Sequence, residues 1–119
     1  MRQRQFFDGI QPWSSKYPNL YLFKLILSMS GRPEDDYIDR VGFREVRIEG
    51  KDILVNGEKI YLKGFNRHED YATVGCAIPF QLMVQDMDLM QEMNANAVRT
   101  CHYPNDERFL DLCDERGMY

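Results

Sequence analysis

The amino-acid sequence predicts a chain in two parts, an all-β part over residues 1–50 and the start of an α/β part over residues 51–119. Two observations support this division. The first part contains long extended runs without helix punctuation, whereas the second part alternates short apolar strands with segments of helical period. Alternating strands and helices are typical of a parallel sheet or barrel. The two parts therefore belong to different domains.

The first predicted strands lie on either side of an acidic turn. Residues 20–30 form a long apolar run rich in aromatic and branched side chains, which predicts a buried strand. Glycine, proline and acidic residues at positions 31–36 predict the turn. Residues 37–48 predict a second extended stretch, whose alternation of apolar and charged residues slips once, as at a β-bulge. Together they indicate an antiparallel hairpin or a sandwich edge.

A tight hairpin and a short strand lead into the second part. Asn56-Gly57 lies between extended segments at 52–55 and 59–62, and both residues tolerate the positive φ of a two-residue turn. Residues 61–66 then predict a short strand that ends in polar residues. A loop follows through residue 78.

Two predicted helices and a strand continue the α/β part. Pro79 suits the first turn of a helix that fades at Asn94. Its apolar side chains recur at helical spacing and are expected in the core: Phe80, Met83, Val84, Met87, Met90 and Met93. Residues 97–100 predict a brief strand.

The last predicted helix begins after an N-cap at Asn105-Asp106 and ends at Gly117. Its expected inner stripe consists of Phe109, Leu110 and Cys113. Met118-Tyr119 would begin a further strand. The order of strand, helix, strand, helix and strand predicts successive right-handed βαβ units.

Composition and charge exclude several classes of function. A net charge of −4, with lysine and arginine scattered along the chain, offers no basic stripe for nucleic acid. No segment approaches the roughly 20 apolar residues that span a bilayer, and the basic residues 1–5 are not followed by signal-peptide features. We therefore expect a cytoplasmic protein without nucleic-acid or membrane partners, whose three cysteines are free thiols.

Polar residues gather at the ends of two predicted parallel strands. Residues 66–70 follow one strand and residues 99–105 follow the next. In a (β/α)8 barrel the chemistry lies where strands end and βα loops begin, and neighbouring strands are about 4.8 Å apart. We therefore expect both clusters, with the only two histidines, His68 and His102, to form one site.

Four segments of the sequence resemble one enzyme family. They are residues 96–105 (NAVRTCHYPN), residues 56–69 (NGEKIYLKGFNRHE), residues 18–21 together with Trp13, and residues 41–44. This set resembles glycoside hydrolase family 2, which contains β-galactosidases and β-glucuronidases. The resemblance implies that residues 1–50 end an immunoglobulin-like β-sandwich and that residues 51–119 begin a (β/α)8 TIM barrel.

The resemblance also implies retaining hydrolysis of terminal β-glycosides, such as β-galactosides or β-glucuronides, by the intact protein. One glutamate attacks the anomeric carbon while a second protonates the leaving oxygen. In the family both glutamates lie at the ends of later barrel strands, and this sequence lacks those strands. We expect the isolated chain to be inactive and the intact protein to be a homo-oligomer, and we assign no cofactor and no metal ligand.

Catalytic and substrate-binding roles follow from the same resemblance. Arg99 would hydrogen-bond the nucleophilic glutamate and keep it ionised, because its guanidinium is a planar fork suited to a carboxylate. His68, His102 and Asn66 would bind the sugar, since imidazole and amide groups can hydrogen-bond hydroxyls in either direction.

Supporting roles are expected for residues beside these. Glu69 would be a partner of Arg67 or His68, Tyr103 would pack beneath the site, and Asn105 would support it. The acidic residues of the first helix are expected on a solvated face: Asp86, Asp88 and Glu92.

Two other classes of function stay open. One is a metal-dependent barrel hydrolase that uses His68, Glu69, Cys101 and His102 as ligands. The CxxC type of metal spacing is absent, which favours a small buried thiol at Cys101. The other is an inactive carbohydrate-binding or assembly fragment, and the missing glutamates favour it for this polypeptide taken alone.

Overall fold

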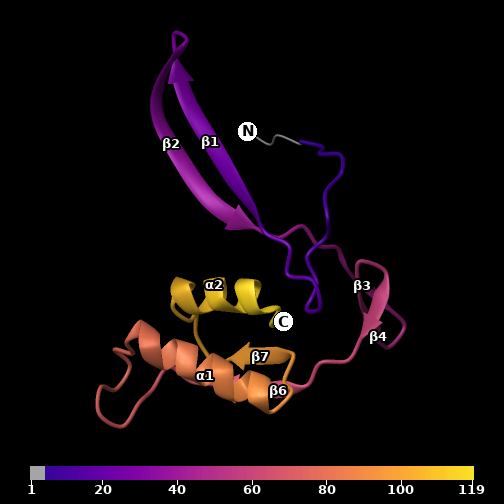
Figure 1. The fold of residues 1–119 in the computed structure, drawn as a ribbon, viewed down its shortest axis with the longest axis vertical. Coiled ribbons are helices and arrows are strands. Elements are labelled where there is room, and N and C mark those ends of the chain that lie inside the picture. Colours follow the sequence, from indigo (N-terminus) through magenta and orange to yellow (C-terminus); the bar gives the residue numbers. More distant parts are fainter. Residues whose placement is uncertain (1–4) are drawn as a thin grey trace.

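The computed structural model describes residues 5–119, so residues 1–4 of the basic N-terminus lie outside the described part. The molecule measures 53 × 41 × 23 Å, with a long ribbon of two strands at one end and both helices at the other (Figure 1). Neither helix in the described part is long and apolar enough to cross a bilayer. The elements in order are β1 (Tyr21–Met29), β2 (Arg32–Val41), β3 (Val46–Glu49), β4 (Asp52–Val55), β5 (Glu58–Ile60), β6 (Gly64–Arg67), α1 (Phe80–Glu92), β7 (Ala97–Thr100) and α2 (Glu107–Arg116).

β1 and β2 form the antiparallel hairpin that the sequence predicts, with a shorter turn than expected. The turn is Ser30-Gly31, whose φ values of 51° and 76° are both positive, as a two-residue hairpin turn requires. The acidic residues predicted in the turn lie in β2, where Asp36 pairs with Lys24 of β1 at 2.7 Å. The irregularity in register falls at Leu27/Ser28, in β1 rather than in the later stretch.

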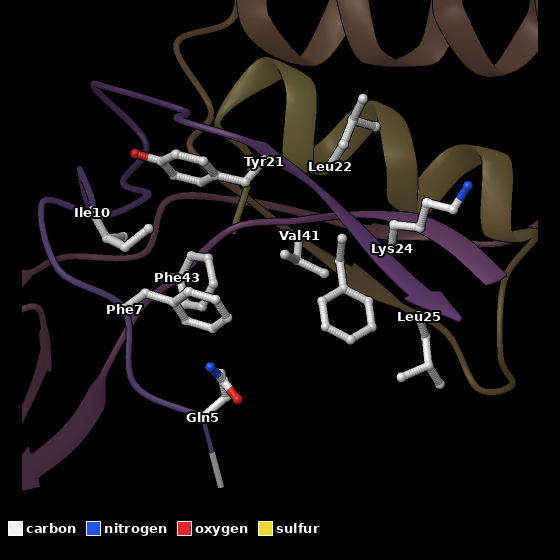
Figure 2. Close-up of a pocket in the computed structure, with 10 residues that line it drawn as sticks. Gln5, Phe7, Ile10, Tyr21, Leu22, Lys24, Leu25, Val41 and Phe43 are labelled. Carbon is white, nitrogen blue, oxygen red and sulfur yellow. The ribbon is translucent and has the colours of Figure 1, made fainter. Parts of the chain in front are cut away.

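The prediction that residues 20–30 form a buried strand is wrong. Leu22 is 76% exposed and Leu27 is 64% exposed. The ribbon projects away from the helices (Figure 1), so within residues 5–119 no second layer covers its faces. Near its base, Phe7, Tyr21 and Phe43 line an apolar hollow of about 690 Å³ (Figure 2).

The predicted extended stretch at 37–48 is broken between β2 and β3, because residues 42–45 pass against Trp13. Trp13 is fully buried, and its backbone N–H donates to the Phe43 carbonyl at 2.8 Å. A Cβ at Gly42 would lie 2.8 Å from the Trp13 Cβ, so only glycine permits this approach. The Trp13 indole Nε1 donates to the Asp114 carbonyl of α2 at 2.8 Å and thereby anchors the N-terminal segment to the helical part.

The hairpin at Asn56-Gly57 is confirmed and joins β4 to β5 in a meander of β3, β4 and β5. The two turn residues have φ values of 52° and 81°. Asn56 also ties the turn to its surroundings, because its side-chain amide donates to the Trp13 carbonyl at 2.9 Å and its Oδ1 accepts from the Glu45 N–H at 3.0 Å.

β6 and β7 form a parallel pair, as the predicted βαβ unit requires. The register aligns Gly64 with Ala97 and Arg67 with Thr100. The predicted next strand is represented by Tyr119, which donates to the Asn96 carbonyl and accepts from the Val98 N–H, both at 2.8 Å. These two bonds have the pattern of a parallel neighbour. Side by side in the sheet, the order is therefore β6, β7 and Tyr119.

The core lies between the two helices and the β6–β7 sheet. Its buried side chains are Ile78, Met83, Met87, Met90, Phe109, Leu112, Cys113 and Met118. Three core predictions are wrong. Leu110 is exposed where Leu112 is buried, Phe80 at the start of α1 is 38% exposed, and Met93 is 66% exposed beyond the end of α1.

Both predicted ends of α2 are confirmed. Asp106 is its N-cap and accepts from the Arg108 N–H, and Gly117 closes it with a φ of 67°. The Arg108 side chain and backbone N–H lower the pKa of Asp106 to about 2.

Gly64→Ala should destabilise the parallel pair. A Cβ at Gly64 would lie 1.6 Å from the Ala97 carbonyl oxygen, so the strands would have to separate. We expect the free energy of unfolding, measured by urea titration, to fall by at least about 1–3 kcal/mol. Gly50→Asn is the control, because a Cβ there meets nothing within 4 Å and asparagine tolerates positive φ. Equal losses in both variants would contradict the close approach.

The cysteines should differ in their rates of alkylation. Cys76 is exposed, whereas Cys113 is buried and its burial raises its pKa to about 11. Because the thiolate is the reactive form, Cys113 should label on the order of 100-fold more slowly than Cys76 at about pH 8. Peptide mass spectrometry measures both rates, and the difference should vanish in denaturant. Equal rates in the folded protein would show that Cys113 is accessible.

Candidate functional site

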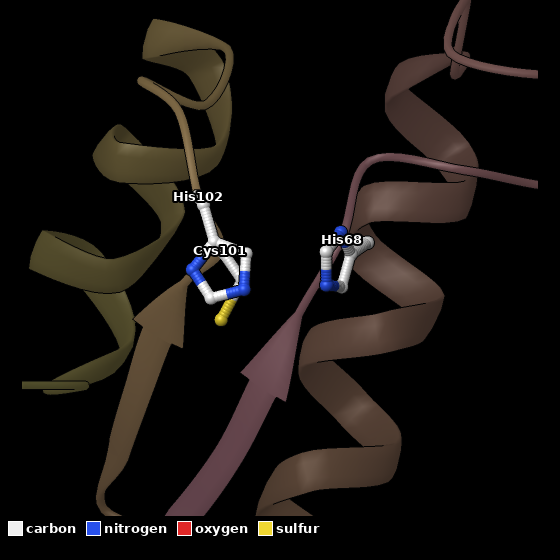
Figure 3. Close-up of side chains that lie close together, drawn as sticks. All are labelled: His68, Cys101 and His102. Atoms are coloured by element: carbon white, nitrogen blue, oxygen red, sulfur yellow. The ribbon is translucent and has the colours of Figure 1, made fainter.

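The two polar clusters meet at the carboxyl ends of β6 and β7, as the sequence predicts. The register places Asn66 beside Arg99. His68 directly follows β6, while Cys101 and His102 directly follow β7, and these side chains face one another (Figure 3). The ring centroids of His68 and His102 are 5.5 Å apart and the rings are nearly perpendicular. Both histidines are exposed, so these side chains are accessible to a ligand.

Tyr103 and Glu69 join the loops that carry the two histidines. The Glu69 N–H donates to the Tyr103 hydroxyl at 2.7 Å, and the Tyr103 ring lies 6.2 Å from that of His68. Tyr103 is 41% exposed. It therefore lies beside the site and does not pack beneath it as expected.

Arg99 extends from β7 toward the same end of the sheet. Its Nη2 lies 3.4 Å from His102 Nδ1, and its Nη1 donates to the Cys101 Sγ at 3.5 Å. Within residues 5–119 no carboxylate forms a salt bridge with Arg99. Its guanidinium is exposed and keeps donors free for an anionic partner.

Arg67 lies below the site as the centre of a buried polar network. The residue is 6% exposed. Its Nε donates to Asp86 at 3.0 Å, and its Nη1 donates to Glu69 at 3.2 Å and to Asn105 at 2.8 Å. The guanidinium carbon also lies 3.9 Å from the centroid of the Phe109 ring, a cation–π contact. These bonds hold β6, α1 and the loop before α2 together.

This network decides three predictions about supporting residues. Glu69 is a partner of Arg67, as predicted, and its carboxylate also accepts from the Asp106 N–H at 2.9 Å. Asn105 is buried and bonded to Arg67. Asp86 was expected on a solvated face, and that prediction is wrong. Sequence reasoning missed it because the pairing depends on how α1 lies across β6.

Three side chains of the site are arranged like metal ligands. The donor atoms of His68, Cys101 and His102 all lie within 4.8 Å of one another. Glu69, the fourth ligand of the metal-dependent alternative, is not in this group, because Arg67 and the Asp106 backbone hold its carboxylate. The catalytic and substrate-binding roles of Arg99, His68, His102 and Asn66 stay predictions.

Parallel strands with polar residues at their carboxyl ends, each followed by a helix, are the arrangement in which α/β barrels carry their active sites. Residues 46–119 match the family model for the TIM barrel domain of glycosyl hydrolases family 2. The chain belongs to this family, which confirms the resemblance seen in the sequence.

Known relatives of the chain are β-glycosidases. A β-galactosidase from Streptococcus thermophilus is 44% identical over 114 residues, which are 92% of this chain and 11% of that protein. A family 2 β-galacturonidase from Eisenbergiella tayi, solved with bound galacturonate, is 51% identical with a TM-score of 0.93. A β-glucuronidase from Ruminococcus gnavus is 34% identical with a TM-score of 0.88.

The solved relatives are much longer than this chain. The match covers 98% of this chain and 21% of the E. tayi structure, and 92% of this chain and 19% of the R. gnavus structure. The chain therefore corresponds to a small part of each relative.

Arg67→Met should destabilise the fold strongly. Removing one partner of a buried ionic network leaves the other charges uncompensated, so we expect a loss of about 3 kcal/mol in the free energy of unfolding. Arg116→Met is the matched control, because the pair of Arg116 with Asp88 is about half exposed and contributes about 0–1 kcal/mol. Urea titration of both variants tests the difference. Equal small losses would show that the Arg67 network is not a structural centre.

Proposed function

We propose that the full-length protein containing this chain is a retaining β-glycosidase that removes terminal β-linked galactosyl or hexuronosyl groups. One observation carries the proposal: in a chain of glycosyl hydrolase family 2, β6 and β7 bring His68, His102 and Arg99 to one strand-end site. The relatives named above act on β-galactosides, β-galacturonides and β-glucuronides.

We assign the chain's side chains to binding and positioning. His68, His102 and Asn66 hydrogen-bond the sugar hydroxyls, and imidazole can serve as donor or acceptor there. Arg99 holds the nucleophilic carboxylate in its ionised form, and the absence of a carboxylate partner within residues 5–119 supports this role. The nucleophile and the proton donor would be glutamates on later barrel strands, about 5–5.5 Å apart.

We also propose the setting of this unit. β1 and β2 would belong to an immunoglobulin-like sandwich ending near residue 50, and their exposed apolar side chains support a covering layer in the full-length protein. The exposed apolar side chains of β1 and β2 also support a homo-oligomer, because contact with another subunit could cover them. The free thiols at Cys76, Cys101 and Cys113 support a reducing compartment, the cytoplasm.

A chromogenic substrate screen tests the activity. The full-length protein should hydrolyse at least one of the β-galactoside, β-galacturonide and β-glucuronide of 4-nitrophenol with retention at the anomeric carbon, followed by NMR. The 119-residue chain alone should hydrolyse none, because under this proposal the nucleophile and the proton donor lie on later barrel strands. Inversion, or turnover by the pure 119-residue chain, would overturn the proposal.

His102→Ala in the full-length protein tests the site. If His102 contacts a hydroxyl whose hydrogen bond strengthens in the transition state, the variant should lose about 2–4 kcal/mol of transition-state stabilisation. This loss is measured as a lower kcat/KM. The melting temperature should stay nearly constant, because His102 is exposed. Glu92→Ala, on the exposed side of α1, is the control and should change neither quantity. Near-normal kcat/KM with a much lower melting temperature would make His102 structural.

A further inference from the structure

We propose that His68, Cys101 and His102 bind a divalent ion of the zinc class, and that this ion and the sugar exclude each other. The exclusion rests on the function proposed above, whereas the metal site stands without it. The three donor atoms lie within 4.8 Å of one another, from two adjacent parallel strands (Figure 3).

The geometry needs only a small adjustment to hold the ion. Zinc lies about 2.0–2.1 Å from a histidine nitrogen and about 2.3 Å from a cysteine sulfur. Donor atoms that share one ion are therefore closer together than 4.8 Å, the upper limit of their spacing in this structure. The two imidazole rings must move toward the ion site by about 1 Å. Both histidines are exposed at the ends of their strands and can rotate, whereas Cys101 is 1% exposed and fixed. A fixed sulfur and two movable imidazoles can close on an ion.

The donor set selects the class of ion. One sulfur and two imidazole nitrogens suit zinc and softer metals, whereas magnesium and calcium require oxygen ligands. Three protein ligands leave one tetrahedral position open to water. The nearby carboxylate of Glu69 is bound to Arg67, so it does not convert the site to an oxygen-rich one.

The charge around the site is compatible with a thiolate ligand. Arg99 Nη1 lies 3.5 Å from the Cys101 Sγ and can donate to the metal-bound sulfur, while in the free site the thiol donates to the Arg99 carbonyl at 3.3 Å. The thiol proton passes to solvent as the metal–sulfur bond forms. Arg99 also repels the ion, so the affinity is lower than that of a structural zinc site. Modest affinity is what a reversible inhibitor needs.

The ion would occupy the groups assigned to the sugar. Each imidazole nitrogen that binds the metal loses its capacity to hydrogen-bond a hydroxyl. Zn²⁺ should therefore raise the apparent KM of the full-length protein and leave kcat unchanged, and a chelator should restore the KM. A fall in kcat without a rise in KM would overturn the mutual exclusion.

Cadmium titration of the full-length protein tests the site directly. Cd²⁺ should produce thiolate-to-metal charge-transfer absorbance, and Cys101→Ser should lose one equivalent of it. Cys76→Ser is the matched control, because Cys76 is exposed and lies outside the ligand group, and this variant should keep that equivalent. Full absorbance in Cys101→Ser would overturn the site.

Two further variants test the imidazole ligands. His68→Ala and His102→Ala should each weaken Cd²⁺ binding by at least on the order of 10-fold, because even residues behind a ligand contribute that much. These exposed side chains keep the test valid if Cys101→Ser unfolds, which its melting temperature would show. Unchanged affinity in both histidine variants would overturn the three-ligand site.

The two proposals can fail separately. A protein that binds Cd²⁺ through Cys101 but hydrolyses no β-glycoside keeps the metal site and loses the proposed function. A protein that hydrolyses a β-glycoside but shows no Cys101-dependent absorbance loses the metal site alone. For each variant, the activity with Zn²⁺ is compared with the activity of the same variant without metal. A loss of activity caused by the substitution itself is then not counted as inhibition.

Discussion

The buried guanidinium of Arg67 is the interaction on which the rest of the site depends. A charge placed in the interior is stable only when it is paired and hydrogen-bonded, and here the partners come from α1, from the loop after β6 and from the loop before α2. Satisfying one side chain therefore fixes three segments at once. His68 is the next residue after Arg67, so its position follows from the same network.

A second constraint joins the N-terminal segment to this unit. Trp13 is fully buried, bonds to the Asp114 carbonyl of α2 and packs edge-on against Tyr119 at 5.5 Å. The same side chain packs so closely against Gly42 that a Cβ there would lie 2.8 Å from the Trp13 Cβ. A single large side chain thus separates the β1–β2 ribbon from the β3–β5 meander and links the segment before β1 to the helical part.

Local patterns allowed the element order to be predicted, while contacts between distant segments were missed. The Asn56-Gly57 turn and the Gly117 cap depend on φ preferences of single residues, and both are confirmed. The break at residues 42–45 and the pairing of Asp86 with Arg67 depend on Trp13 and on the crossing of α1, which no local pattern encodes. Parallel pairing placed both histidines together correctly, because strand ends share one edge.

Hydrogen bonding separates the buried polar residues at this strand edge from the exposed ones. Arg67, Glu69 and Asn105 direct most of their polar groups to one another, to Asp86 or to neighbouring backbone. Within the described residues, Arg67 Nη2 is buried without a hydrogen-bond partner. The exposed histidines show a different pattern, since their rings pack edge-on with centroids 5.5 Å apart and neither belongs to the buried network. A buried polar layer whose groups are mostly bonded to one another, below exposed side chains that are not, is the arrangement that a preorganised binding site requires. Under the two proposals above, this constellation would accept either hydroxyl groups or a soft metal ion, because it fixes the spacing of the donor atoms and the ligand that is present decides which one binds.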